Sequence, residues 1–257
     1  MQHQFGGTQR LYSQSGLKRL TQATVTIVGI GGVGSWVAEA LARTAVGKLI
    51  LIDMDDICVT NTNRQIHAID VNVGRLKVEV MAKRINSINP ECQVVPVIDF
   101  ISANNLTDHI DKNTDYVVDA IDNARTKAAM IAFCKRQKIK IITIGGAGGQ
   151  KDPLKITVGD LSRSWQDPLS AKVRNDLRRN HGFSKNPKRR FGVECVYSTE
   201  QLIYPKSDGT VSYEKQLREG SARLDCAQGF GASVTVTATF GMVAAARIIN
   251  KLVGKEG

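Results

Sequence analysis

The chain has 257 residues, of which 42% are apolar, and it carries a formal net charge of +11 at pH 7. This length and apolar content suffice to bury a full core, so we expect the chain to fold alone, as one large α/β domain or one domain with an appendage. The excess of positive charge favours a polyanionic partner such as nucleic acid and says nothing about the fold.

The five cysteines lie more than thirty residues apart and form no C-x-x-C pair, which fits a reduced compartment and gives no grounds for a disulfide framework or a thiolate zinc site. The histidines show no metal-ligand spacing. The N-terminal stretch lacks the apolar core of a signal peptide, and the apolar run from Phe230 to Ala246 is shorter than the roughly 20 residues that a membrane span needs. We therefore expect a cytoplasmic protein, not bound to a membrane, in which that run forms a buried helix.

Strands and helices alternate along the first half of the chain. A β-branched run at 25–28 ends at Gly29, a helical apolar spacing follows from Val33 to Leu41, and the run at 49–52 is the next strand. The same reading predicts helices at 77–88, after residue 102 and at 125–136, and strands at 94–98, 116–120 and 139–144. Such alternation implies a parallel sheet covered on both faces, so the fold class is a Rossmann-like, doubly wound α/β fold with a mainly parallel sheet.

The pattern of polar and apolar residues changes after Gly149. Residues 162–190 hold one polar helix and a loop, 193–197 and 201–205 read as a further pair of strands, and a long helix closes the chain from about 232 to 252. We expect a nucleotide-binding domain over residues 1–150 and, over 151–257, a C-terminal α/β extension of the same fold that binds the substrate.

A glycine pattern follows the first strand directly. Gly29, Gly31 and Gly34 form G-x-G-x-x-G, and Asp53 stands nineteen residues after the last of them, at the end of the second strand. Such glycines let the backbone approach phosphates at a helix N-terminus, and the acid accepts the ribose hydroxyls. The pattern alone leaves three readings open: a dinucleotide, another nucleotide, or a tight turn with no ligand.

The residues that follow the strands favour ATP. Asn61, Arg64, Lys77 and Asp122 lie after successive strands or at the starts of helices, which is the ligand-binding edge of an open α/β sheet. An enzyme that cleaves ATP must neutralise a triphosphate, whereas a dehydrogenase needs little cationic chemistry there. Taken singly, each charge also reads as a solvated surface group, and Asp122 with Asn123 also reads as a helix N-cap.

The order of these residues resembles the ThiF/MoeB/HesA family, the bacterial relatives of ubiquitin-activating enzymes. The resemblance covers about Phe5 to Gly149. The matching positions are Gly29, Gly31, Gly32, Gly34, Asp53, Asp55, Asn61, Arg64, Gln65, Lys77, Asp122 and Asn123.

The resemblance implies a role for each position. ATP and Mg²⁺ would be the cofactors: Asp53 would take the ribose, Arg64 and Lys77 would stabilise charge on the phosphates, and Asp122 would organise Mg²⁺. Family members also insert an N-terminal arginine into the partner subunit's site, which makes Arg10 a catalytic candidate and implies a homodimer. The common reaction is attack of a carboxylate on the α-phosphate, which gives an acyl-adenylate and pyrophosphate.

The carboxylate that is activated differs between branches of the family. Members that activate sulfur-carrier proteins usually carry two C-x-x-C pairs, and this chain has none. Its second half, with "KNPKRRFGVECVYSTE" and "DCAQGFGASVTVTATFG", resembles instead the branch that dehydrates threonylcarbamoyladenosine in tRNA. Adenylation of the free carboxylate of that nucleoside makes AMP a leaving group, and an internal nucleophile then closes a ring. Two alternatives stay open: an adenylyltransferase for a sulfur carrier, with a cysteine desulfurase or sulfur acceptor as partner, and a non-catalytic RNA-binding module.

The positive charge is concentrated in one stretch. Between residues 172 and 190 there are eight Lys or Arg against one Asp, and these cations are predicted to contact tRNA phosphates, the alternative being a solvated surface. For Phe191 and Tyr197 we expect core packing before base stacking, and for Cys226 we expect burial before a reactive thiolate. The eight cations are Lys172, Arg174, Arg178, Arg179, Lys185, Lys188, Arg189 and Arg190.

Overall fold

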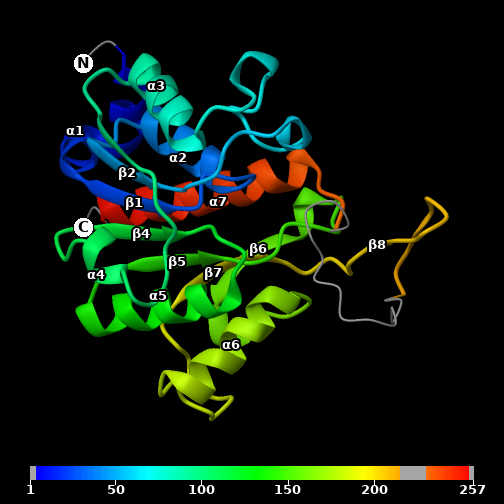
Figure 1. Cartoon of the computed structure of the whole chain (residues 1–257). Helices are drawn as coiled ribbons and strands as arrows, with labels where there is room; N and C mark the ends of the chain where they lie inside the picture. The colour runs from blue at the N-terminus through cyan, green and yellow to red at the C-terminus, as the bar shows by residue number, and fades with distance from the viewer. Residues whose placement is uncertain (1–3, 215–229, 255–257) are drawn as a thin grey trace.

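The computed structural model describes residues 4–214 and 230–254. Its centre is a seven-stranded sheet with the strand order β3-β2-β1-β4-β5-β7-β6 (Figure 1). Neighbouring strands pair in parallel except β6 and β7, which pair antiparallel. The predicted Rossmann-like, mainly parallel fold is thereby confirmed. The strands are β1 (Thr24–Val28), β2 (Lys48–Ile52), β3 (Gln93–Val97), β4 (Tyr116–Asp119), β5 (Ile141–Ile144), β6 (Ile156–Asp160) and β7 (Glu194–Ser198).

Helices cover both faces of this sheet, as Figure 1 shows. The apolar faces of α1, α2, α3 and α7 form one core against it, and α5 and α6 form the other. Four short 3₁₀ helices lie in the connections, at Val59–Asn61, Asp70–Asn72, Pro153–Lys155 and Leu161–Arg163. The α-helices are α1 (Gly6–Gln22), α2 (Gly34–Arg43), α3 (Lys77–Ile88), α4 (Leu106–His109), α5 (Ala124–Gln137), α6 (Pro168–Asn180) and α7 (Val234–Val253).

The order of the strands reverses between β1 and β4. The chain adds β2 and β3 on one side of β1 and then returns to place β4 on its other side. In open α/β sheets, ligands bind beyond the carboxyl ends of the strands at such a switch point. The glycine loop that follows β1 lies at this position.

Helix α7 is the core helix that the apolar run predicted. By length and composition alone it is long and apolar enough to cross a membrane, yet half of its most apolar window is buried inside the fold. Phe240 is fully buried, and a Cβ added to Gly241 would come within 2.7 Å of the Trp36 Cβ on α2. The helix therefore packs closely on α2 and forms part of the protein core.

Three elements differ from the expectations. Helix α1 was not predicted, because it is polar and kinked at Ser13, whose φ is 64°. No strand was predicted at Ile156–Asp160, where β6 forms the edge of the sheet. The predicted strand at 201–205 is wrong. Only Tyr204–Pro205 (β8) pairs, and it pairs with Val211–Ser212 (β9) in a separate hairpin, because the preceding backbone is held by the β5 loop through an Ile203 N–H to Gly149 C=O bond of 2.8 Å.

The second half of the chain continues the first. Strands β6 and β7 lie beyond residue 150 and extend the same sheet from β5. The polar helix predicted within 162–190 is α6. Phe191 and Tyr197 are buried, which confirms that they pack in the core. Cys226, for which burial was expected, lies outside the described residues.

Candidate active site

The loop after β1 requires glycine at two positions. Gly29 has a φ of 91°, and a Cβ there would lie 2.9 Å from the carbonyl oxygen of Ala120. A Cβ on Gly34 would lie 1.8 Å from the carbonyl oxygen of Gly29. The loop leads into the N-terminus of α2, and within the described part of the chain the backbone N–H groups of residues 31–33 have no hydrogen-bond acceptor. Unpaired N–H groups at a helix N-terminus form an anion-binding site.

Two side chains from other segments hold the glycine loop. Asp53, which follows β2, accepts hydrogen bonds from the backbone N–H groups of Ile30 at 2.7 Å and Asp55 at 2.9 Å. The Nε2 atom of His67 lies 3.0 Å from the carbonyl oxygen of Ile30, and His67 is 2% exposed. Burial lowers the pKa of His67 to about 4, so its imidazole is neutral and Nε2–H donates to the Ile30 carbonyl. His67, for which no role was predicted, helps fix the loop.

Arg64 lies across the glycine loop. A Cβ added to Gly32 would meet its Cγ at 3.1 Å, and its Nη1 donates to the carbonyl of Thr60 at 3.0 Å. The indole N–H of Trp36, on α2, donates to the Arg64 carbonyl at 3.0 Å, which ties the Arg64 segment to the helix that the glycine loop begins. The guanidinium is therefore close to the position where phosphates of a nucleotide would bind.

Lys77 and Asp55 form an ion pair at the same edge of the sheet. Lys77 is the first residue of α3 and is 6% exposed, and its Nζ lies 2.7 Å from Asp55 Oδ2. The Asp55 side chain is 66% exposed, so the buried ammonium is held by a carboxylate that faces solvent.

Asn61 and Gln65 belong to the segment that carries Arg64. The Oδ1 of Asn61 accepts a hydrogen bond from the Cys58 N–H at 3.1 Å, so Asn61 caps the short helix at Val59–Asn61. Gln65 is 6% exposed, and its Oε1 has no partner among the described residues. A buried amide oxygen without a partner marks a group that a ligand or water satisfies.

Asp122 and Asn123 lie in the loop between β4 and α5. Asn123 Oδ1 accepts from the Thr126 N–H at 3.0 Å, which makes it the N-cap of α5. Asp122 is exposed, and within the described ranges its carboxylate has neither a hydrogen bond nor an ion pair. No group of three or more His, Cys, Asp or Glu that could hold a metal occurs in residues 4–214 and 230–254. A metal at this edge would therefore need oxygen ligands from a bound phosphate or water beside Asp122, an arrangement that suits Mg²⁺.

A buried ion pair beneath this loop was not predicted. The Nζ of Lys127 donates to Asp119 Oδ1 at 2.9 Å and to the carbonyl of Ile121 at 3.0 Å, and Thr143 Oγ1 donates to Asp119 Oδ2 at 2.6 Å. Both members of the pair are at most 1% exposed. The ammonium thus fixes the backbone directly before Asp122. The sequence feature that could have indicated this pair is Lys127, a lysine among the apolar residues of α5.

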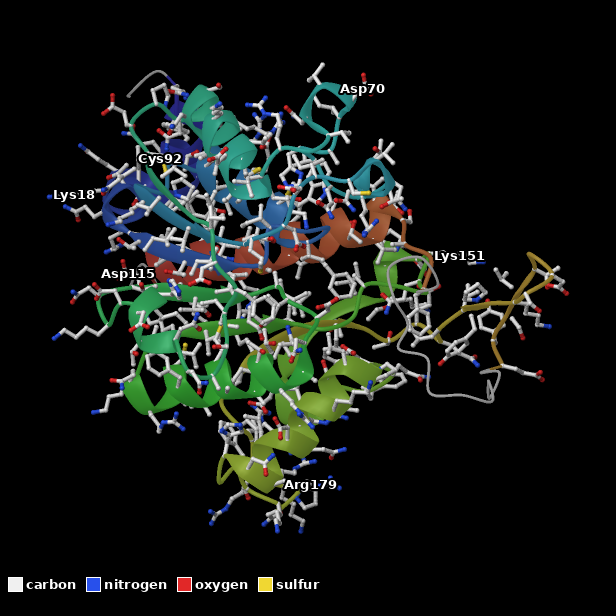
Figure 2. The ribbon with its side chains drawn as sticks, in the orientation of Figure 1. Lys18, Asp70, Cys92, Asp115, Lys151 and Arg179 are labelled. Atoms are coloured by element: carbon white, nitrogen blue, oxygen red, sulfur yellow. The ribbon has the colours of Figure 1, made fainter. Side chains whose placement is uncertain are left out.

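The predicted nucleic-acid residues lie away from the glycine loop, on α6 and the segment that follows it (Figure 2, where Arg179 is labelled). Lys185, Lys188, Arg189 and Arg190 are exposed. Arg174 and Arg178 are half-buried: Arg174 lines a cavity beside the start of α6, and the Arg178 guanidinium lies 5.3 Å from the centre of the Phe191 ring.

Arg10 lies in the first part of α1 and is exposed. Gly16, later in the same helix, packs on Val253 at the end of α7. The Arg64 segment contacts the other end of α7, because the Asn63 side chain donates to the carbonyl of Ala232 just before that helix begins. Among the described residues, no side-chain hydrogen bond or ion pair joins Arg10 to the site of its own chain.

Comparison with known proteins places this geometry in a family. The model of the ThiF family matches residues 7–257. The chain belongs to the ThiF family. It is similar to the tRNA threonylcarbamoyladenosine dehydratase of Escherichia coli strain K12, with 56% identity over 98% of this chain and 94% of that protein.

Two further likenesses of this ThiF-family chain differ in how much of the chain they cover. The crystal structure of the E. coli tRNA N6-threonylcarbamoyladenosine dehydratase in complex with ATP superimposes with a TM-score of 0.87 at 50% identity, over 98% of this chain and 94% of that one. The ThiS sulfur-carrier adenylyltransferase of E. coli is 33% identical over only 52% of this chain and 54% of that protein. The likeness to the dehydratase therefore includes the second half of the chain, and the likeness to the adenylyltransferase covers only about half of it.

Proposed function

We propose that this chain is an ATP-dependent enzyme that dehydrates threonylcarbamoyladenosine in tRNA. The observation that carries the proposal is the 56% identity to the E. coli dehydratase over 98% of the chain, because it spans both the nucleotide-binding edge and the basic second half. The relative whose structure contains ATP has the same fold over the same length. In this proposal residues 1–150 bind ATP and residues 151–257 bind the RNA.

The chemistry follows from the charges at the carboxyl edge of the sheet. ATP supplies the adenylyl group: the substrate carboxylate attacks the α-phosphate, pyrophosphate leaves, and the acyl-adenylate that forms has AMP as its leaving group. The free N–H groups of residues 31–33 bind phosphate oxygens, and Asp53 accepts from the ribose hydroxyls with the lone pairs that its contacts to the loop leave free. Arg64 and Lys77 stabilise the negative charge that collects as pyrophosphate leaves. An internal nucleophile of the nucleoside then displaces AMP, so the protein needs no nucleophile of its own.

Mg²⁺ fits the donor set at this edge. The exposed carboxylate of Asp122 has no ion pair among the described residues, whereas Asp55 and Asp119 are each paired with a lysine. In the proposal, Asp122 holds the ion together with phosphate oxygens, and the ion supplies charge neutralisation. The Lys127–Asp119 pair keeps the Asp122 loop in place.

The basic residues of α6 and the segment after it provide the tRNA contacts. Lys172, Arg179 and the four cations of 185–190 are exposed, and they lie in the second half of the chain, which the likeness to the E. coli dehydratase includes. Phosphate contacts of this kind give affinity without reading sequence and weaken as salt rises. We further propose that the enzyme works in the cytoplasm as a homodimer in which Arg10 enters the partner subunit's site.

Release of pyrophosphate distinguishes this function from its alternative, an adenylyltransferase for a sulfur-carrier protein. The purified chain is given ATP and Mg²⁺ with tRNA that carries threonylcarbamoyladenosine, with the same tRNA lacking the modification, or with an acidic carrier protein. Release with the modified tRNA alone supports the proposal. Release with the carrier and not with either tRNA replaces it by the alternative, and a chain that binds RNA but turns over no ATP is a non-catalytic module.

A further inference from the structure

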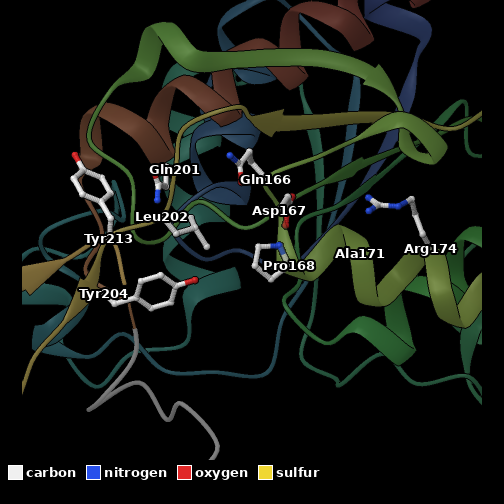
Figure 3. A pocket seen from close by; sticks show the side chains of 9 residues that line it. All are labelled: Gln166, Asp167, Pro168, Ala171, Arg174, Gln201, Leu202, Tyr204 and Tyr213. Atoms are coloured by element: carbon white, nitrogen blue, oxygen red, sulfur yellow. The ribbon is translucent and has the colours of Figure 1, made fainter. Parts of the chain in front are cut away.

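A cavity of about 340 Å³ opens beside the start of α6, next to the β8–β9 hairpin (Figure 3). This volume is at the lower end of the range that holds small-molecule ligands. Its walls combine aromatic, amide, apolar and cationic side chains. The residues that matter for the argument are Gln166, Arg174, Gln201, Leu202, Tyr204 and Tyr213.

Arg174 supplies the positive charge of the cavity. It shares a face of α6 with the buried residues Ser170, Val173 and Leu177, and it donates to Ser164 Oγ. Burial lowers the pKa of its guanidinium. Within the described ranges Arg174 forms no ion pair, and the nearby Asp167 is already occupied by the N–H of Gly146 and by the N–H and hydroxyl of Ser170. A half-buried cation without a carboxylate partner favours an anionic ligand.

The two tyrosines supply ring faces on the opposite wall. Tyr204 is held by its neighbours, because the Ile203 N–H bonds to the Gly149 carbonyl at 2.8 Å and the Tyr204 ring packs on Phe230 with centroids 5.2 Å apart. Tyr213 is 56% exposed at the rim. In Figure 3 the Tyr204 hydroxyl points toward Pro168, and Arg174 reaches the cavity from α6. Aromatic rings with an arginine are the groups that proteins use to hold an unstacked base and its phosphate.

The cavity adjoins the edge where ATP is proposed to bind. The loop 145–149 follows β5, which is the parallel neighbour of β4, the strand that leads to Asp122. Asp167, which lines the cavity, also accepts from the N–H of Gly146 at 3.2 Å, so the loop and the cavity wall are joined. Four of the five residues in this loop are glycine, and the side chains of Asp167 and Phe230 pack directly against them.

We propose that this cavity receives the adenine base of the modified nucleotide after it leaves the RNA stack, an inference that rests on the proposed function. Tyr204 and Tyr213 stack on the base, and Arg174 binds the phosphate attached to it. The threonylcarbamoyl arm extends from the base along the loop 145–149, which brings its carboxylate to the ATP edge. Extrusion of a base costs stacking free energy, and the ring contacts in the cavity offset that cost.

Two full-length tRNAs that differ at one position test this inference. One carries threonylcarbamoyladenosine at the target position, and the other carries an abasic site there, so only the first fills the cavity. Affinities of both are measured for the wild type and for Tyr204→Ala, Tyr213→Ala and Arg174→Gln. Tyr213→Phe keeps the ring as a matched control, and Trp165→Ala removes an exposed aromatic residue that does not line the cavity.

We expect the wild type to prefer the modified tRNA and each tyrosine-to-alanine variant to lose about 5-fold to 100-fold of that affinity, with the abasic tRNA bound as before. Arg174→Gln weakens the modified tRNA more than the abasic one, whereas Tyr213→Phe and Trp165→Ala keep the full preference. Preference retained in all three cavity variants, or absent from the wild type, overturns the inference. Pyrophosphate release by the wild type with modified tRNA is recorded in parallel: release without a cavity effect refutes the cavity alone, and no release refutes the proposed function.

Discussion

Lys77 Nζ lies 2.7 Å from Asp55 Oδ2, with the lysine buried and the carboxylate facing solvent. The pair connects the start of α3 to the segment after β2, and it holds an ammonium at the edge of the sheet without exposing its alkyl chain. We expect Lys77→Ala to lower the rate of pyrophosphate release by at least about 100-fold, the scale seen when one electrostatic stabiliser is removed. Lys83→Ala, an exposed lysine on the same helix, is the matched control and should keep the wild-type rate.

Arg64→Ala and Asp122→Ala are expected to fold normally and to lose turnover by at least about 100-fold each. Arg64 lies over Gly32, and Asp122 is exposed beyond β4, so neither side chain contributes to the core. The rate is measured at saturating ATP, with circular dichroism to check the fold and Asp108→Ala as an exposed-acid control. Near-normal turnover in both variants would show that these two roles are misassigned.

Some residues at this edge of the sheet could be identified from the sequence, and others could not. Gly29 and Gly34 were found from the sequence because a Cβ at either position clashes with backbone, a constraint that leaves a visible pattern. Lys127 was missed, because the sequence shows a lysine in a helix and cannot show the Asp119 carboxylate that pairs with it from β4. The partner of a buried charge is a tertiary contact, which local pattern does not encode.

Arg174 is the opposite case, because the sequence itself distinguishes it from the exposed cations Lys172 and Arg179. It was counted with seven other cations because they are close in sequence. Ser170, Val173, Arg174 and Leu177 are spaced as one helical face, and three of the four are buried, which separates Arg174 from the exposed cations of α6. The strand predicted at 201–205 is only partly formed for a different reason: Ile203 bonds to the loop after β5, and only Tyr204 and Pro205 pair with another strand, β9.

The free energy of unfolding is expected to depend on pH through the protonation of His67. Its pKa is lowered from the usual value to about 4 by burial, so the folded state binds fewer protons than the unfolded state between these two values. Stability from this residue is therefore complete above about pH 6.5 and is lost as the pH falls toward about 4, by on the order of 3 kcal/mol. Urea unfolding at several pH values measures it. The His67→Gln variant should show a flatter dependence over that window; an equally steep one would mean that another group titrates.

Subunit mixing tests the position of Arg10. Arg10→Ala and Asp122→Ala subunits are each expected to be inactive, and a mixed dimer should recover activity, because one of its two sites then keeps both residues. The heterodimer is isolated with two different affinity tags before the assay. An isolated heterodimer that stays inactive would place Arg10 outside the partner subunit's site.

The exposed basic residues are expected to set the salt dependence of tRNA binding. Replacing Lys185, Lys188, Arg189 and Arg190 by Ala should weaken binding and flatten its dependence on log salt by up to about 0.9 per lost phosphate contact. ATP affinity should change little, because these residues lie away from the glycine loop. A charge-matched variant that removes Lys18, Arg19, Lys83 and Lys112, which are exposed on other elements, should keep the wild-type slope. Equal slopes in the wild type and the first variant would mean that these side chains face solvent and do not contact tRNA phosphates.

The chemical change in the RNA is the most direct test of the proposed function. Purified tRNA that carries threonylcarbamoyladenosine is incubated with the protein, ATP and Mg²⁺, then digested to nucleosides under mild conditions and analysed by mass spectrometry. We predict that the modified nucleoside becomes lighter by the mass of one water, with one AMP formed for each nucleoside changed, and that neither occurs with the Asp122→Ala variant. A modified nucleoside of unchanged mass, from a protein shown to bind both ATP and the tRNA, would contradict the account.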